Sequence, residues 1–250
     1  AMVLAAGEGT RIREVTQGKI PKPMVDLGPG PLLEHTVNEL VDFGVDEIVI
    51  NLHHRGEVIK DYFGDEWRGT PIHYSEEEEL LGTAGGVKNV GERFDDAFIV
   101  VYGDILTDLD FHEIVDYHRG REGAATIMVY EEEREALSEA SIILTDENER
   151  VQQFMEKPSQ ETIEKHMGRD FWTNAGIYVL EPEVLDYMPE GFSDFSHDIF
   201  PALLDAEEEI YVFPQPEKTY WHEVGNPERY SKARKDIEKH EIAFNDGESR

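Results

Sequence analysis

The octapeptide Leu4-Ala5-Ala6-Gly7-Glu8-Gly9-Thr10-Arg11 overlaps the end of a short apolar strand that we predict at Val3–Ala5. Gly7 and Gly9 permit positive φ angles and a close approach of the backbone, so that successive N–H groups can face one anion. From these residues alone, a phosphate-binding loop and an ordinary tight turn both stay open.

The residues that follow exclude two common kinds of phosphate loop. A dinucleotide-binding fingerprint needs a third glycine at position 12, where Ile12 stands. A Walker A loop needs Ser or Thr after its lysine, whereas Gly18-Lys19 is followed by Ile20. If the loop binds phosphate, it therefore belongs to another class.

The loop is cationic in an otherwise acidic chain. The 250 residues have a formal net charge of −32, but the stretch from Gly7 to Met24 carries more cations than acids. The charged residues of this stretch are Arg11, Arg13, Lys19 and Lys22, opposed by Glu8 and Glu14. Pro21 and Pro23 stiffen the backbone on both sides of Lys22 and restrict where it points. We therefore expect Arg11 and Lys22 to clamp a polyphosphate.

Strand and helix patterns alternate in the first half of the chain. We predict strands at Asp46–Leu52, Pro71–Tyr74, Ala97–Tyr102 and Ala124–Tyr130, and helices at Leu32–Phe43, Val58–Phe63, Ala84–Phe94 and Phe111–His118. This alternation is typical of βαβ units with a parallel sheet. The fold class is therefore α/β, with a Rossmann-like, mixed but mainly parallel sheet flanked by helices.

The regular alternation of strands and helices ends after residue 130. We predict short strands at Ser141–Leu144, Val151–Glu156, Ala175–Leu180, Ile210–Phe213 and Tyr220–Val224, and helices near 182–188, 196–205 and 227–240. No flexible linker separates the halves. We expect a single domain over 1–250, with a nucleotide-binding lobe at about 1–130 and a second lobe at about 131–250.

The composition restricts the class of protein. Hydrophobic residues make up 39% of the chain, enough for a sizeable core, and no apolar run approaches the roughly 20 residues of a membrane span. The absence of cysteine excludes disulfides, thiolate metal sites and a cysteine nucleophile. The negative charge argues against nucleic acid as a partner. With no signal peptide recognised, we expect a cytoplasmic protein with no membrane partner, and the scattered acids favour a halophilic surface.

Further blocks of residues follow the first loop along the chain. They are Leu81-Gly82-Thr83-Ala84-Gly85, Tyr102-Gly103-Asp104, Glu156-Lys157-Pro158, Asn174-Ala175-Gly176 and Trp221-His222-Glu223-Val224-Gly225. Together with the first loop and Pro21-Lys22-Pro23-Met24-Val25, they resemble the signature of the sugar-1-phosphate nucleotidylyltransferases, most closely the mannose-1-phosphate guanylyltransferases. The resemblance covers nearly the whole chain. It implies a nucleotide-diphospho-sugar transferase fold and transfer of a nucleotidyl group from a nucleoside triphosphate to a sugar 1-phosphate, with release of pyrophosphate.

The resemblance implies a role for each matching residue. The catalytic residues would be Arg11, Lys22 and Lys157, of which Lys157 would hold the sugar phosphate. The nucleotide-binding residues would be Leu4, Ala6, Gly7, Gly9, Thr10, Gly82 and Thr83. The sugar-binding residues would be Gly103, Glu156, Asn174 and Gly176. From the residues alone, Glu156-Lys157 is equally an ordinary surface pair, and Asn174 an ordinary strand start.

The resemblance also implies a Mg²⁺ cofactor held by Asp104 and Glu223. Asp104 follows the strand Ala97–Tyr102 at its carboxyl end, where ligands bind in open α/β sheets, although an acid there is also a common cap. Glu223 departs from the family, which has Asp at this position. Its longer side chain either reaches the ion or leaves it partly ligated by water. Asp108 and Asp110 are interpreted as turn and cap residues.

The substrates stay open. GTP with mannose 1-phosphate is favoured over UTP or dTTP with glucose 1-phosphate or an amino-sugar 1-phosphate, and a homo-oligomer is left open. The alternative from another class is a non-catalytic nucleotide-sugar sensor of the same fold, although Arg11, Lys22, Asp104 and Lys157 are all retained. We expect no left-handed β-helix domain, which some relatives carry for acetyl transfer.

Two polar stretches are interpreted as structural. His53-His54 have no third ligand at metal spacing, so we expect them to end a strand. Glu76–Glu79 are expected to form a solvated acidic surface.

The acidic surface leads to a prediction about salt. Carboxylates that repel one another destabilise the fold in dilute buffer, and salt screens them with a Debye length of about 8 Å at 0.15 M and about 3 Å at 1 M. We expect the melting temperature to rise between dilute buffer and molar salt, measured by the loss of circular dichroism on heating. An unchanged melting temperature would contradict a halophilic surface.

Overall fold

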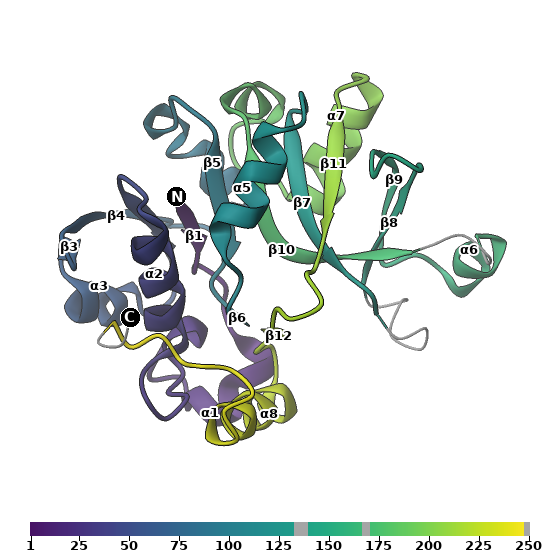
Figure 1. Cartoon of the computed structure of the whole chain (residues 1–250). Helices are drawn as coiled ribbons and strands as arrows, with labels where there is room; N and C mark the ends of the chain where they lie inside the picture. Colours follow the sequence, from purple (N-terminus) through teal and green to yellow (C-terminus); the bar gives the residue numbers. More distant parts are fainter. Residues whose placement is uncertain (133–139, 167–170, 248–250) are drawn as a thin grey trace. The chain divides into compact units, whose positions relative to one another are not determined.

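The chain forms two compact units, each built from several segments. The computed structural model describes residues 1–132, 140–166 and 171–247 (Figure 1). Unit 1 contains Ala1–Leu80, Val101–Glu113 and Glu217–Arg250, and unit 2 contains Leu81–Val100 and Ile114–Pro216. Strand β5 (Phe98–Tyr102) passes along the chain from unit 2 into unit 1.

The main sheet of unit 1 is parallel except at one edge. Strand β1 (Met2–Leu4) pairs in parallel with β2 (Ile48–Leu52), which pairs in parallel with β4 (Thr70–Glu76). The short β3 (Glu66–Trp67) is antiparallel to β4. All five residues of β2 are buried, as expected for a central parallel strand. The carboxyl ends of β1 and β2 therefore lie side by side.

Helix α2 (Leu32–Phe43) has the bounds that the sequence predicts. It ends where Gly44 adopts a φ of 91°, a left-handed conformation that favours glycine. Helix α3 (Gly56–Phe63) buries Ile59 and Phe63 and follows β2 after a short loop.

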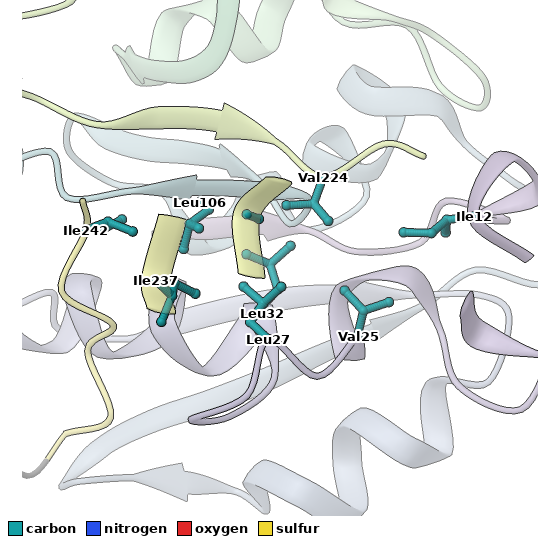
Figure 2. Close-up of a cluster of buried hydrophobic side chains, with 9 residues drawn as sticks. Ile12, Val25, Leu27, Leu32, Leu106, Val224, Ile237 and Ile242 are labelled. Atoms are coloured by element: carbon teal, nitrogen blue, oxygen red, sulfur yellow. The ribbon is translucent and has the colours of Figure 1, made fainter. Parts of the chain in front are cut away.

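A cluster of buried aliphatic side chains joins distant segments of unit 1 (Figure 2). It includes Ile12 from the turn η1 (Thr10–Ile12), Leu106 from β6 (Ile105–Thr107) and Ile237 from α8 (Pro227–Glu238). Strand β6 pairs in antiparallel fashion with β12 (Trp221–Glu223). The cluster therefore fixes the loop after β1 relative to β6 and to α8.

The chain after α8 runs along α2 (Figure 1). The backbone N–H of Asn245 donates to Nδ1 of the buried His35 at 2.8 Å, so that Nε2 carries the proton and donates to the Thr107 carbonyl at 2.7 Å. Both ring nitrogens are thus used to connect α2 with β6 and the last described residues.

Unit 2 contains a mixed sheet. Strand β7 (Ala125–Tyr130) pairs in parallel with β11 (Ile210–Pro214) and in antiparallel fashion with β10 (Trp172–Leu180). Strand β10 also pairs with β8 (Ser141–Thr145), which pairs with β9 (Val151–Glu156), both in antiparallel fashion. Helices alternate with these strands along the chain, which confirms the predicted α/β class.

The remaining helical segments are short. They are α1 (Arg13–Thr16), η2 (Lys22–Met24), α4 (Gly82–Lys88), η3 (Gly91–Arg93), α5 (Phe111–Arg119), α6 (Gln160–Lys165), η5 (Pro182–Tyr187), η6 (Phe195–Ile199) and α7 (Phe200–Asp205). Within the described ranges, no helix is both long enough and apolar enough to cross a membrane.

Two predictions from the sequence are wrong in detail. The helix predicted at Ala84–Phe94 ends at Lys88, and a separate 3₁₀ turn covers Gly91–Arg93, where glycine weakens the helical pattern. Glu77, predicted to belong to a solvated surface, is 6% exposed, and its carboxylate accepts a hydrogen bond from Asn51 at 2.7 Å. An acidic run does not show which of its members turns inward, because that depends on the strand beside it.

Candidate functional site

The loop after β1 is held from two sides in unit 1. The N–H of Ala5 donates to Oδ1 of Asn51 at the end of β2, at 2.6 Å. Gly9 has a φ of 61°, and a Cβ at this position would lie 3.0 Å from Cβ of Lys22. Gly7 has no positive φ and open space around it, so the conformational requirement falls on Gly9. Gly9 therefore lets the segment containing Lys22 lie against the loop.

Lys22 lies among carboxylates. Its side chain is 12% exposed, and its ammonium group contacts Oδ2 of Asp104 and lies 3.9 Å from Oε1 of Glu223. The guanidinium of Arg11 lies 3.5 Å from the same Glu223 oxygen. The structure thus brings together the predicted residues Arg11, Lys22, Asp104 and Glu223, which come from three separate parts of the sequence.

Asp104 is placed by the turn that follows β5. The N–H of Gly103 donates to the Leu4 carbonyl at 2.9 Å, and a Cβ on Gly103 would lie 2.9 Å from that same oxygen. The Asp104 carbonyl accepts the N–H of Val224 at 2.7 Å, which continues the β6–β12 pairing. Asp104 therefore lies between the end of β1 and the end of β12.

Glu223 is held by a residue that the sequence analysis did not identify. Arg229, in the first turn of α8, donates to Oε2 of Glu223, while Oε1 faces Lys22 and Arg11. A Cβ at Gly225 would lie 2.2 Å from Oε1, so glycine makes room for the glutamate side chain. Asn226 fixes the start of the helix, since its Oδ1 accepts the N–H of Arg229 at 2.9 Å.

The neighbouring His222 does not add to the local positive charge. Burial lowers the pKa of His222 below its usual range, and its Nε2 lies 2.9 Å from the Arg229 carbonyl. A neutral imidazole donates to that carbonyl. The cations close to Glu223 in the described residues are therefore Lys22, Arg11 and Arg229.

The two acids have the chemistry that a magnesium ion requires. Asp104 and Glu223 offer carboxylate oxygens, and their side chains are 21% and 26% exposed, so solvent and ligands can reach them. No cluster of three or more metal-binding side chains occurs in the described ranges. A pair of carboxylates suits Mg²⁺, which keeps several waters or substrate phosphates in its coordination shell.

A pocket of about 200 Å³ opens beside the loop, entirely within unit 1. Its lining includes Gly9, Thr10, Arg13 and Lys22, together with the His53-His54 pair that follows β2. The expectation that these histidines end a strand is confirmed, since β2 stops at Leu52.

In unit 2, the predicted pair Glu156-Lys157 stands at the end of β9. Ser141 donates its hydroxyl proton to Oε2 of Glu156, and Nζ of Lys157 lies 3.7 Å from Oε1. Lys157 has a φ of 43°, an uncommon conformation for a residue with a side chain. Such local strain is found preferentially at functional positions.

The predicted sugar-binding residues of unit 2 are joined by hydroxyl groups. Nδ2 of Asn174 lies 2.7 Å from the Tyr178 hydroxyl and 3.5 Å from Oγ of Ser196, which is 3.5 Å from Oγ of Ser141. Ser141 in turn contacts Glu156. Gly176 has a φ of 73°, where the pairing of β10 with β7 shifts its register. Glycine is thus needed there for the backbone conformation.

The predicted nucleotide-binding residues Gly82 and Thr83 contact another part of unit 2. Oδ1 of Asp194 accepts both the N–H and the hydroxyl of Thr83 at 3.0 Å, and the Ser193 carbonyl accepts the N–H groups of Ala84 and Gly85. A Cβ at Gly82 would lie 2.4 Å from that carbonyl. The N–H groups of residues 83–85 are therefore already paired within unit 2, and the assignment of Gly82 and Thr83 to nucleotide binding stays a prediction.

The residues that sequence reasoning missed are Arg229, Ser141, Ser196 and Asp194. Asn226-Pro227 does indicate a helix start, which places Arg229 in a first turn. No sequence signal links Arg229 to Glu223, or the two serines to one another, because these contacts depend on folding.

Known proteins of one family are similar to this chain over most of its length. A family model described as nucleotidyl transferase matches residues 1–240. A UTP–glucose-1-phosphate uridylyltransferase of Synechocystis is 37% identical over 97% of this chain and 64% of its own length. A mannose-1-phosphate guanylyltransferase of Mycobacterium tuberculosis is 32% identical over 95% of this chain and 64% of its own length. The chain thus spans less than two thirds of these relatives.

A solved structure is similar over most of the chain. HddC from Yersinia pseudotuberculosis complexed with GMP-PN has a TM-score of 0.74 and 28% identity, covering 94% of this chain and 98% of its own. Together with the family model, it confirms the family and fold class that the motifs predict.

The contact between Gly103 and Leu4 leads to a prediction. A Cβ at Gly103 meets a backbone carbonyl that cannot move aside, so Gly103→Ala should lower the free energy of unfolding by about 1–3 kcal/mol. Gly7→Ala is the matched control, because its Cβ would enter open space. Urea denaturation measures both. Equal stability of the two variants would show that Gly103 is not sterically required.

Proposed function

The chain belongs to the nucleotidyl transferase family, and we propose that the protein transfers a nucleotidyl group from a nucleoside triphosphate to a sugar 1-phosphate. The products are a nucleotide sugar and pyrophosphate. The names of the relatives that match most of the chain, a uridylyltransferase and a guanylyltransferase acting on sugar 1-phosphates, support this reaction class.

The observation that carries the proposal is the charge cluster of unit 1. Lys22 and Arg11 lie beside Asp104 and Glu223, next to a glycine-dependent loop at the carboxyl end of β1. The chain has 23 lysines and arginines against 55 acids, and two of these cations lie beside a pair of acids suited to magnesium. This combination fits a polyphosphate bound with a divalent cation better than it fits a structural ion pair.

The reaction needs no general base. An oxygen of the sugar 1-phosphate, already ionised at neutral pH, attacks the α-phosphorus and forms the new O–P bond. The bond from the α-phosphorus to its bridging oxygen breaks, and the electron pair leaves on pyrophosphate. Positioning and charge neutralisation are the tasks left to the protein. Arg11 and Lys22 would neutralise the triphosphate and the departing pyrophosphate.

Other residues would orient the substrates. Lys157 would bind the phosphate of the sugar. Glu156 would accept hydrogen bonds from the sugar hydroxyls, and Asn174 would accept hydrogen bonds from them or donate to them. The hydroxyl chain through Ser141 and Ser196 supports this assignment, because it fixes Glu156 and Asn174 relative to each other. Gly82 and Thr83 would lie beside the base, held there by Ser193 and Asp194.

Asp104 and Glu223 would hold Mg²⁺. When bound, the ion supplies positive charge that neutralises phosphate oxygens as a Lewis acid. Arg229 would act by orienting Glu223, since it binds one carboxylate oxygen and leaves the other directed toward Lys22.

GTP with mannose 1-phosphate is the substrate pair that we propose first. The match to the GMP-PN complex of HddC and the guanylyltransferase relatives support it. UTP with glucose 1-phosphate is the second candidate, because the uridylyltransferase of Synechocystis has the higher identity of the two relatives, 37% against 32%.

Pyrophosphate release tests the function directly. The protein is incubated with Mg²⁺ and each combination of GTP, UTP, dTTP, ATP or CTP with mannose, glucose or glucosamine 1-phosphate, at low and at molar salt. We expect release with one combination well above the others. No release with any combination would favour the alternative of a non-catalytic sensor.

Two lysine variants test the proposed roles. Lys22→Ala and Lys157→Ala should each lower kcat/KM by about 30- to 1,000-fold, the effect of losing one charge contact worth about 2–4 kcal/mol in the transition state. Lys239→Ala is the control, because that side chain is 65% exposed and pairs only with Glu241 in the described residues. Turnover near that of the control in either variant would refute its assigned role.

The metal assignment predicts a shifted magnesium requirement. Glu223→Ala and Arg229→Ala should both raise the Mg²⁺ concentration for half-maximal turnover, the second by about 10-fold, as for other residues that orient a metal ligand. Arg119→Ala, at a 73% exposed side chain, controls for the loss of one arginine. A magnesium titration that Glu223→Ala leaves unchanged would rule out Glu223 as a ligand.

A further inference from the structure

Two histidines that the proposed reaction does not use lie in the pocket beside the phosphate loop. β1 and β2 are parallel neighbours with Leu4 opposite Asn51, so the loops that follow them leave the same edge of the sheet. His53 and His54 begin the second of these loops and line the 200 Å³ pocket together with Gly9, Arg13 and Lys22. Residues of both loops therefore line one pocket.

The ring of His53 has a fixed orientation. Its Nδ1 lies 2.8 Å from the backbone carbonyl of Glu77, and a carbonyl only accepts, so Nδ1 carries a proton. In the neutral ring, Nε2 then has a lone pair and no proton. Nε2 can donate to a phosphate oxygen only in the imidazolium form, which couples anion binding to uptake of a proton.

The charged groups that line the pocket favour a bound anion. Arg13 and Lys22 line the same pocket, opposed by Glu8, and His54 is exposed beside them. The carboxylate of Glu77 is turned to Asn51, which donates to it at 2.7 Å. An anion that enters the pocket would therefore meet two permanent cations and two imidazole rings that can accept a proton.

We propose that His53 and His54 bind the terminal phosphates of the nucleoside triphosphate and the released pyrophosphate, with His53 donating from Nε2 as an imidazolium. This assignment rests on the proposed function, and it adds two phosphate-binding residues and a proton linkage to it. Binding is then tighter at low pH than at high pH, since the pair with phosphate stabilises the protonated ring.

Inorganic pyrophosphate is the probe for the test. Isothermal titration calorimetry on the full chain, without divalent cations and at constant ionic strength, gives the dissociation constant between pH 5.5 and 8.5. Titrations at one pH in buffers of different ionisation enthalpy give the number of protons taken up. Because pyrophosphate itself titrates in this range, each result is the difference between the unmodified protein and a variant.

His53→Gln keeps a donor at the site but cannot become charged. We expect its pyrophosphate affinity to be about 10-fold lower than that of the unmodified protein at pH 6, the loss of one charge-assisted hydrogen bond, and nearly equal at pH 8.5. Proton uptake should fall by up to about 0.5 per pyrophosphate, the most that a 10-fold coupling between protonation and binding allows. His54→Gln, at an exposed position, should give a smaller loss with the same pH trend.

His112→Gln is the matched control, because His112 is 62% exposed, pairs with Asp110 and lies outside this pocket. It should bind pyrophosphate and take up protons as the unmodified protein does. Unchanged affinity and proton uptake in both His53→Gln and His54→Gln, or no pyrophosphate binding by the unmodified protein, would overturn the inference. Histidine-dependent binding in a protein that releases no pyrophosphate from any substrate pair would uphold it and refute the proposed function instead.

Discussion

The ammonium group of Lys22 contacts Asp104 and approaches Glu223, and the surrounding part of unit 1 depends on keeping these three charges together. Lys22 is only 12% exposed, so without its acids it would be a largely buried, uncompensated charge, which costs several kcal/mol. The acids without Lys22 would repel each other. The charges therefore hold the turn after β5 and the end of β12 against the Lys22 segment, in the same place where the buried aliphatic cluster joins β6 to α8 (Figure 2).

Glycines decide how closely these segments approach. A side chain at Gly103 would collide with the Leu4 carbonyl, and one at Gly225 would occupy the space of the Glu223 carboxylate. The glutamate at position 223 is one methylene longer than the aspartate expected from the family. The structure accommodates this longer side chain, because Gly225 makes room for it and Arg229 orients it. The length of this side chain and the position of the arginine are two parts of one arrangement.

Local patterns in the sequence predicted what local forces determine. Helix α2 was predicted to the residue because its apolar spacing and Gly44 define both its face and its end. The grouping of Arg11, Lys22, Asp104 and Glu223 was predicted from motif resemblance. Features that depend on folding were not predicted. They are the contact of Arg229 with Glu223, the chain of hydroxyl groups from Glu156 to Asn174, and the burial of Glu77. The interleaving of the two units along the chain also leaves no local signal.

The overall charge makes contact interactions decisive for any phosphate ligand. A net charge of −32 repels polyphosphates at long range, so the field of the whole protein opposes binding. Salt weakens this repulsion, and at molar concentration the screening length of about 3 Å is comparable to a hydrogen-bond distance. Under those conditions only groups in direct contact with phosphate contribute much. A surface rich in acids and a pocket with closely placed cations are therefore compatible, provided that recognition depends on partly buried contacts such as those of Lys22 rather than on electrostatic steering.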